Sequence, residues 1–313
     1  MIMNAYIQKY KQLDLPGRLI AINVCVWAVV QLLRLVVFLF TGSDFHWQGA
    51  LALHANLGEF LHTPWTIVTY FFVHANLGDN VFHIVFNMLW LWWFGKFFLR
   101  YHTGRQLLGV YLMGGLIAGA FYLLCFNAFP YLHSLATPPF GTGPCVVGAS
   151  GAIFALVAAV AMRQPDEAIY LNFFVRVVPV RMKWFALAAL VINLMNLAGG
   201  ENTGGILCHL GGMGFGCAFG YMERKGVDLT RHFNLMCDSV VNLFRKKPKL
   251  KATPGGKPHV YHDRQADHDY NRRQKERQDR IDAILDKISK EGYEGLTAEE
   301  KALLFDSSNR RNR

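Results

Sequence analysis

Residues 204–222 read GGILCHLGGMGFGCAFGYM, an apolar stretch without Asp, Glu, Lys or Arg that holds one histidine, His209. A stretch of this length can cross about 30 Å of hydrocarbon as a helix. Its glycines include Gly212, Gly216 and Gly220, spaced four residues apart and therefore on one face. Small residues let helix backbones approach closely in lipid. The stretch predicts a membrane-spanning helix that packs its glycine face against another helix.

Five similar stretches precede it, at about 19–41, 81–99, 106–127, 146–162 and 182–198. The chain has 313 residues, of which 52% are hydrophobic and only 17% charged, so a soluble domain is excluded as the main body. We therefore expect an all-α membrane protein, a bundle of six transmembrane helices with a small cytoplasmic helical tail. The expected parts are a cytoplasmic N-terminus at 1–18, the six-span domain at 19–222, a basic linker at 223–262 and a helical segment at 263–313.

The distribution of charge predicts the orientation of the spans. Basic residues flank alternate connections, whereas the loops at 42–80, 128–145 and 199–203 contain neither Lys nor Arg. By the positive-inside rule both termini are cytoplasmic, and we expect a multi-pass protein of a bacterial inner membrane. The net charge of +10 then reflects inner loops and attraction to anionic lipid, not nucleic-acid binding, because basic and acidic residues alternate in the tail.

The sequence also predicts where one charged residue and two connecting segments lie relative to the membrane. Arg34, inside the first span, is expected to extend its charge to the outer surface. The segment 169–180, which contains Arg176 and Pro179, is expected to be an interfacial loop. The long loop 42–80 is too polar to cross and should lie at the outer surface. The scattered cysteines form no CxxC pair, so neither structural disulfides nor zinc are expected, and no cleavable signal peptide is recognised.

Polar residues inside apolar spans suggest function, because burying them in hydrocarbon is costly. They occur as His83 with Asn87 in the second span, Ser150 in the fourth and His209 in the sixth. These three spans run inward from the outer side under the predicted orientation. At 1.5 Å per residue, His83, Ser150 and His209 would each lie about 5–10 Å below the outer surface. Their common depth is unexpected for unrelated packing residues.

These residue types suit nucleophilic chemistry. A serine hydroxyl needs an adjacent base, and His209 is available to activate Ser150. Spans four and six contain no Asp or Glu, which indicates a dyad and not a triad. The Asn87 amide, an N–H of His83 and the backbone N–H of Ser150 could donate to a developing oxyanion.

Small and aromatic neighbours support the same interpretation. Gly148 and Gly151 would let backbone and substrate approach Ser150. Gly151 also belongs to a small face on span four that could meet the glycines of span six, Gly212 among them. Phe154, one turn after Ser150, is either a stacking partner of the His209 ring or an ordinary core aromatic.

These motifs together resemble the rhomboid family of intramembrane serine proteases, in its bacterial type. The resemblance covers most of 60–222 and rests on His83-x-x-x-Asn87, on Gly148-x-Ser150-Gly151 with Phe154, and on His209 with its glycines. It implies cleavage of transmembrane proteins near the outer face by a Ser–His dyad, without cofactor or metal. It also implies a mobile fifth helix and loop at about 182–203, with Phe86 beside it. Many members carry a Trp-Arg pair in the first loop, whereas this loop has Trp47 and Trp65 but no Arg.

The tail combines a basic linker with helix signals. Residues 245–260 are rich in Lys, Pro and Gly, and 266–290 carries Ile281, Ile284, Leu285 and Ile288 on one stripe. Gly292 should end that helix, and Thr297 with Glu300 forms a capping-box signal for a second helix that includes Leu303 and Leu304. Such a small hairpin suggests self-association or a partner. His259, His262 and His268 match no strong metal pattern.

Two other functions compete with proteolysis. A rhomboid-like pseudoprotease would bind membrane clients without cutting them, but such proteins usually lose the serine or the histidine. A small transporter would need polar residues that continue toward the cytoplasmic side. After Asn87 the second span reads MLWLWWF, so no polar path continues. The expected partners are therefore transmembrane protein substrates and the lipid bilayer.

Overall fold

The computed structural model describes residues 10, 12–137, 143–173, 176–197, 202–244 and, in the tail, 272, 275–276, 279–288, 292, 295–297 and 299–301. The chain divides into two compact units, Met1–Lys246 and Lys247–Arg313.

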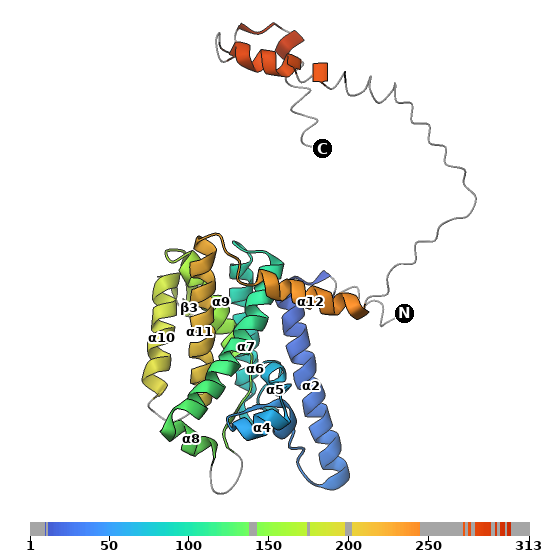
Figure 1. Cartoon of the computed structure of the whole chain (residues 1–313), viewed down its shortest axis with the longest axis vertical. Coiled ribbons are helices and arrows are strands. Elements are labelled where there is room, and N and C mark those ends of the chain that lie inside the picture. The colour runs from blue at the N-terminus through green and yellow to red at the C-terminus, as the bar shows by residue number, and fades with distance from the viewer. Residues whose placement is uncertain are drawn as a thin grey trace, which may run out of the picture. The chain divides into compact units, whose positions relative to one another are not determined.

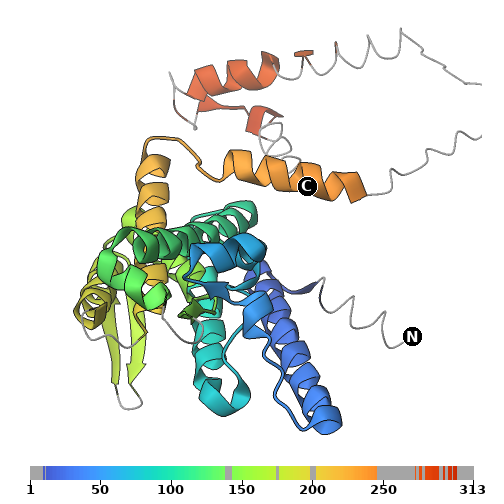
Figure 2. The ribbon, with the colours of Figure 1, turned by 60° about the horizontal axis from the view of Figure 1, so that its bottom comes forward.

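A helix forms at each of the six expected spans. Their bounds are α2 Leu15–Thr41, α6 Leu77–Phe98, α7 Gly104–Ala128, α9 Ser150–Arg163, α10 Met182–Leu197 and α11 Thr203–Arg224. In the described residues, α2, α6 and α7 are long and apolar enough to cross a membrane, and α9 and α10 are shorter apolar helices. The six helices run side by side, with α2 and α10 on opposite sides of the bundle (Figures 1 and 2). The chain is therefore a mostly helical integral membrane protein.

Local sequence sets the helix ends. The Asp14 carboxylate accepts a hydrogen bond from the Gly17 backbone N–H at 3.0 Å, and Pro16 occupies the first turn of α2, so this helix begins four residues earlier than expected. Gly42, with φ of 69°, ends it in the left-handed conformation that glycine favours. Thr103 and Gln106 form a capping box at the start of α7.

The loop after α2 is a folded substructure. It contains α3 Gln48–Leu51, strand β1 Leu53–His54, α4 Leu57–His62 and α5 Thr66–Thr69. Its fully buried Trp47 donates its indole N–H to Asn76 Oδ1 at 2.8 Å, just before α6 begins. Strand β1 pairs antiparallel with β2 Cys145–Val146, which follows α8 Pro130–Ala136. This loop therefore holds the segment that leads into α9.

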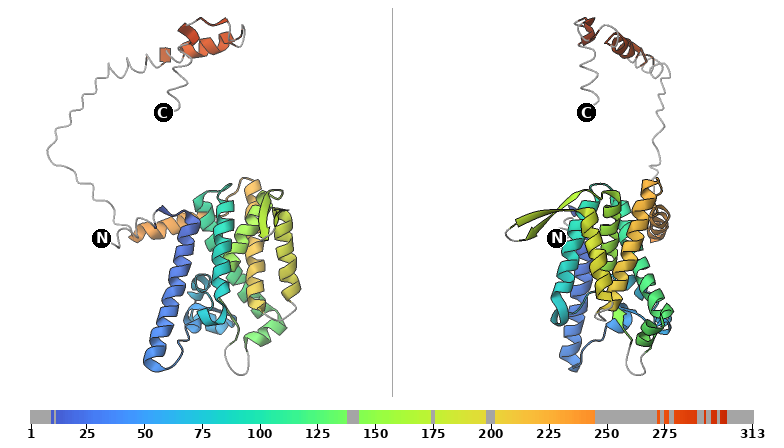
Figure 3. Two further views of the ribbon diagram at one scale, coloured as in Figure 1. Left: turned by 180° about the vertical axis from the view of Figure 1, so that it is seen from behind. Right: turned by 90° about the vertical axis from the view of Figure 1, so that its left-hand side faces the viewer.

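The fold is mostly helical, as expected, and its described residues also contain short antiparallel strand pairs. Besides β1 and β2, strands β3 Ala168–Phe173 and β4 Arg176–Arg181 pair antiparallel between α9 and α10. They form a hairpin where we expected an interfacial loop at 169–180. The hairpin projects sideways from the bundle (Figure 3, right). A two-stranded sheet has only edge strands, which tolerate Pro179.

Arg34 directs its side chain toward the end of α2, where an acidic partner binds it. Its guanidinium forms two hydrogen bonds to the Asp44 carboxylate, at 2.9 and 2.6 Å, and a longer one to Gln31. The charge of Arg34 is thus paired with that of Asp44 just beyond the C-terminal end of α2. Asp44 is held in its ionised form, because its hydrogen bond to Arg34 lowers the pKa of the carboxyl.

The residue range expected to be a basic linker contains a helix. Helix α12 Arg231–Phe244 lies across the span helices at one end of the bundle (Figure 1). Asn234 anchors it by donating to the Arg105 carbonyl at 3.0 Å, beside the close contact of Thr230 with Gly109. The linker expectation therefore fails over 231–244, and residues 245–271, with the three tail histidines, lie outside the described residues.

The tail unit contains the expected capping box. The Thr297 N–H donates to the Glu300 carboxylate at 2.7 Å, and the Glu300 N–H donates to Thr297 Oγ1 at 3.3 Å. Residues 279–288 are helical, and Gly292 adopts a positive φ of 76° after them. Ile284 is buried but Leu285 is exposed, so the apolar stripe is narrower than expected. Leu303 and Leu304 lie outside the described residues.

Candidate active site

Ser150 is the first residue of α9, four residues after the expected start of that span. Pairing of β2 with β1 holds the preceding chain extended, and the loop that follows is fixed by two hydrogen bonds. The Gly148 N–H donates to the Tyr70 carbonyl at 2.9 Å, and the Ala149 N–H donates to His74 Nε2 at 3.4 Å. The nucleophile candidate thus sits at a helix N-terminus on a loop that other segments position.

Gly148 has no tolerated substitute in this loop. Its φ of 115° is a conformation that residues with a side chain rarely adopt. A Cβ atom at this position would also lie 2.7 Å from His83 Nε2. Both the backbone turn before Ser150 and the approach of His83 therefore require glycine.

Ser150 and His209 are in contact. The Ser150 Oγ lies 2.8 Å from His209 Nε2, a hydrogen-bond distance. The backbones of α9 and α11 approach closely enough to allow this: a Cβ on Gly212 would collide with the Gly151 carbonyl oxygen, and a Cβ on Gly216 with the Ala155 carbonyl. The expected packing of the glycine faces of spans four and six is what the structure contains.

The other side of the His209 ring is held by a residue that the sequence analysis missed. His209 Nδ1 lies 2.8 Å from Asn193 Oδ1, which belongs to α10. The Asn193 Nδ2 donates to the Ala189 carbonyl at 2.8 Å, so the amide oxygen faces His209 as an acceptor. His209 Nδ1 therefore carries the proton, and the lone pair of Nε2 faces Ser150. The ring of Phe154 lies 4.5 Å from the His209 ring, tilted by 36°.

His83 and Asn87 face Ser150 from α6. His83 Nδ1 accepts the Ala75 N–H at 3.4 Å, so in the neutral ring Nε2 carries the proton and lies toward Gly148. The Asn87 Nδ2 donates to the His83 carbonyl at 2.7 Å, which uses one of its two N–H groups. Two side-chain donors therefore border the space beside the Ser150 backbone N–H.

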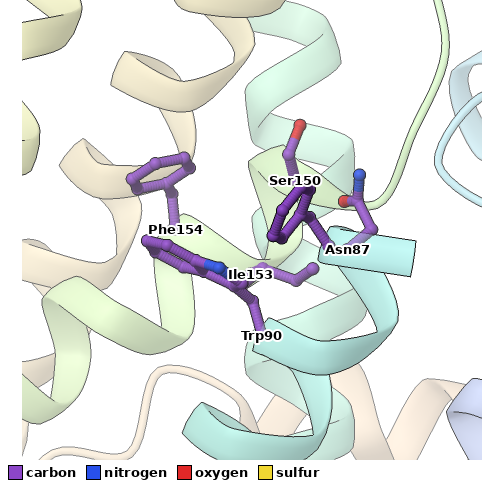
Figure 4. Close-up of a pocket in the computed structure, with 6 residues that line it drawn as sticks. Asn87, Trp90, Ser150, Ile153 and Phe154 are labelled. Carbon is purple, nitrogen blue, oxygen red and sulfur yellow. The ribbon is translucent and has the colours of Figure 1, made fainter. Parts of the chain in front are cut away.

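Two cavities meet at Ser150. One, of about 640 Å³, is lined by His83, Asn87, Ser150 and His209 together with residues from the 145–147 and 202–205 segments. The other, of about 130 Å³, is apolar and lies between α6 and α9 (Figure 4). Its lining comprises Phe86, Asn87, Trp90, Ser150, Ile153 and Phe154. A larger cavity with polar and apolar lining and a smaller apolar cavity thus adjoin the same hydroxyl.

His74 is the second residue that the sequence analysis missed. Its ring is almost fully buried, and burial, with the nearby His83 ring, lowers the pKa of His74 to about 3. The ring is therefore neutral and can accept the Ala149 N–H. Both missed residues share a signal with those that were found, since each is a polar residue in or beside an apolar run.

The structure thus brings together the residues that the sequence predicted for the catalytic site and its support. Ser150, His209, His83, Asn87, Gly148, Gly151, Phe154 and Gly212 all lie at one place between α6, α9 and α11.

Two family models match separate parts of the chain. The rhomboid domain matches residues 61–226, and a family of unknown function (DUF6576) matches residues 264–310. The chain is 31% identical over 169 residues to RHOMBOID-like protein 12, mitochondrial, of Arabidopsis thaliana, which is 51% of this chain and 47% of that protein. It is 29% identical over 158 residues to the human Presenilin-associated rhomboid-like protein, mitochondrial, covering 50% of this chain and 34% of that protein.

The matched region spans less than half the length of these relatives, and their names place them in mitochondria. They give no support to the expected bacterial inner membrane. The rhomboid domain nevertheless covers more than half of the chain, from the loop before α6 to the end of α11, and includes the whole Ser150 site. The chain therefore belongs to the rhomboid family.

Proposed function

We propose that the chain is an intramembrane serine endopeptidase that crosses the membrane six times with both termini on the same side. The observation that carries the proposal is the contact of Ser150 Oγ with His209 Nε2, beside two donors and an open cavity. The orientation rests on the basic residues of alternate loops, and a bacterial inner membrane with cytoplasmic termini stays a prediction.

The geometry supports acyl transfer through Ser150. As the hydroxyl oxygen attacks a peptide carbonyl, His209 Nε2 takes its proton. The resulting oxyanion would accept from the Ser150 N–H, the His83 Nε2–H and the free Asn87 N–H. The imidazolium then gives its proton to the leaving amine, and water hydrolyses the ester by the reverse sequence of proton transfers.

The position of the site supports a transmembrane protein as substrate. Ser150 contacts His209, which lies six residues after the start of α11, so the site is recessed by about 9 Å from that end of the helix. The apolar cavity beside it, lined by Phe86 and Trp90, would take an apolar side chain of the substrate. Neither a client-binding role without cleavage nor transport has an observation in its favour, because the dyad is in contact and the α6 residues after Asn87 are aromatic and aliphatic.

The test uses the purified protein in detergent and a fluorophosphonate probe, which labels an activated serine. We expect the wild type to be labelled and to cleave a fluorescent transmembrane substrate in liposomes, whereas Ser150→Ala and His209→Ala lose both activities. Ser134→Ala and His133→Ala are the matched controls, since both residues lie on α8, away from the site. Labelling that persists in Ser150→Ala would contradict the proposal.

A further inference from the structure

Helix α10 is the least enclosed of the span helices near the site. Its buried residues are Met182, Ala186 and Asn193, and only Asn193 lies in the half of the helix that follows Ala189. The other side chains of that half include Val191, Ile192, Leu194 and Met195, each at least 44% exposed. Apolar packing therefore contributes little to holding this end of α10 against the bundle.

The polar contact of Asn193 with His209 lies in this half of α10. Asn193 is itself 8% exposed, and its amide is oriented by the bond from Nδ2 to the Ala189 carbonyl. The Oδ1 atom of Asn193 therefore faces His209 Nδ1 as a hydrogen-bond acceptor, at 2.8 Å. Among the described residues, Asn193 Oδ1 is the acceptor beside His209 Nδ1 and therefore fixes the tautomer of the ring.

We propose that Asn193 is a positioning residue that makes the reactivity of Ser150 depend on the position of α10. With α10 against α11, His209 presents its Nε2 lone pair to Ser150. When α10 moves away, the Nδ1–H loses its acceptor, and the ring is free to rotate or to exchange tautomers.

This inference rests on the proposed protease function, and it predicts a specific kinetic pattern. Loss of the acceptor acts on His209 and not on substrate contacts, so kcat should fall while KM changes little. The small fluorophosphonate probe needs no displacement of α10, and its labelling rate should fall as well. Loss of one hydrogen bond to a buried polar group corresponds to roughly a tenfold decrease.

The experiment compares Asn193→Leu with Asn196→Leu. Asn196 lies on the same helix, is exposed and bonds only to the Ile192 carbonyl, so it is a matched control. We expect Asn193→Leu to label about tenfold more slowly or worse and Asn196→Leu to match the wild type. Asn193→Asp, which keeps an acceptor oxygen, should recover most of the labelling rate. Equal rates in the two leucine variants would overturn the proposal.

A second measurement separates this proposal from the protease function. Hydrogen exchange of the amides of residues 190–197 reports on α10 without any activity. Asn193→Leu should exchange faster there than Asn196→Leu, with unchanged exchange in α9. If the wild type neither labels nor cleaves, the protease function fails, and exchange alone then decides whether Asn193 holds α10. Unchanged exchange in Asn193→Leu would contradict the role in holding the helix.

Discussion

Helices α9 and α10 both contact α11 beside the active site, and they do so by opposite means. Against α9, Gly212 and Gly216 of α11 lie directly on backbone carbonyls, with no side chain between them. Against α10, whose C-terminal half is mostly exposed, the contact includes one polar bond, from His209 to Asn193. The first contact fixes where Ser150 and His209 lie, whereas the second fixes how the His209 ring is oriented. Position and orientation of one side chain therefore depend on different neighbours.

The substitution Gly212→Ala should disturb the contact between α9 and α11 most strongly. A Cβ here collides with the Gly151 carbonyl oxygen, which belongs to rigid backbone, so the two helices must separate. We expect a loss of stability of about 3 kcal/mol, the upper range for overpacking, and loss of probe labelling. Thermal unfolding in detergent measures the first effect.

Gly214→Ala is the matched control, because nothing lies within 4 Å of a Cβ at that position. Alanine has a higher helix propensity than glycine by about 1 kcal/mol, so this variant should be as stable as the wild type or slightly more stable. Equal destabilisation by the two substitutions would show that the contact of Gly212 with Gly151 does not cause the loss of stability.

Acid should weaken the loop that carries Ser150. The folded pKa of His74, about 3, lies below its ordinary value of 6.5. Between these values the unfolded chain binds the proton and the folded chain does not, so stability falls as pH drops from 6.5 toward 3. At pH 5.5 this costs about 1.4 kcal/mol relative to neutral pH. The melting temperature of His74→Gln should therefore depend less on pH than that of the wild type, and equal pH profiles would contradict the assignment.

The smallest expected effect belongs to the ring contact of His209. Phe154→Leu keeps an apolar side chain but removes the aromatic contact at 4.5 Å. Leucine keeps the apolar part of the contact, so we expect the low end of the range for aromatic contacts, about 0.5 kcal/mol, and labelling slower by roughly twofold. A loss as large as that of Asn193→Leu would mean that stacking, and not the α10 bond, mainly orients the ring. Phe129→Leu, on an exposed aromatic, serves as the control.

Features repeated along one helix could be predicted from the sequence. The spacing of the glycines at 212, 216 and 220 indicated the close contact between spans four and six. The polar residues inside apolar spans indicated the site. Features that depend on pairing distant segments could not. Helix α9 starts late because the preceding strand β2 pairs with the distant strand β1. No local sequence pattern predicts this pairing. Likewise, the sequence shows Asn193 and Asn196 as equivalent polar residues, and only the rotation of α10 decides which one meets His209.

The separation of the two reactive residues along the chain has a consequence for biosynthesis. Ser150 and His209 are 59 residues apart, and the base lies on the last helix of the bundle. During translation the serine enters the membrane while its base has not yet been made. A nascent chain, or a fragment that ends before α11, therefore carries the hydroxyl without the group that would activate it. Under the proposed function, the order of synthesis by itself keeps an unfinished enzyme from cutting its neighbours.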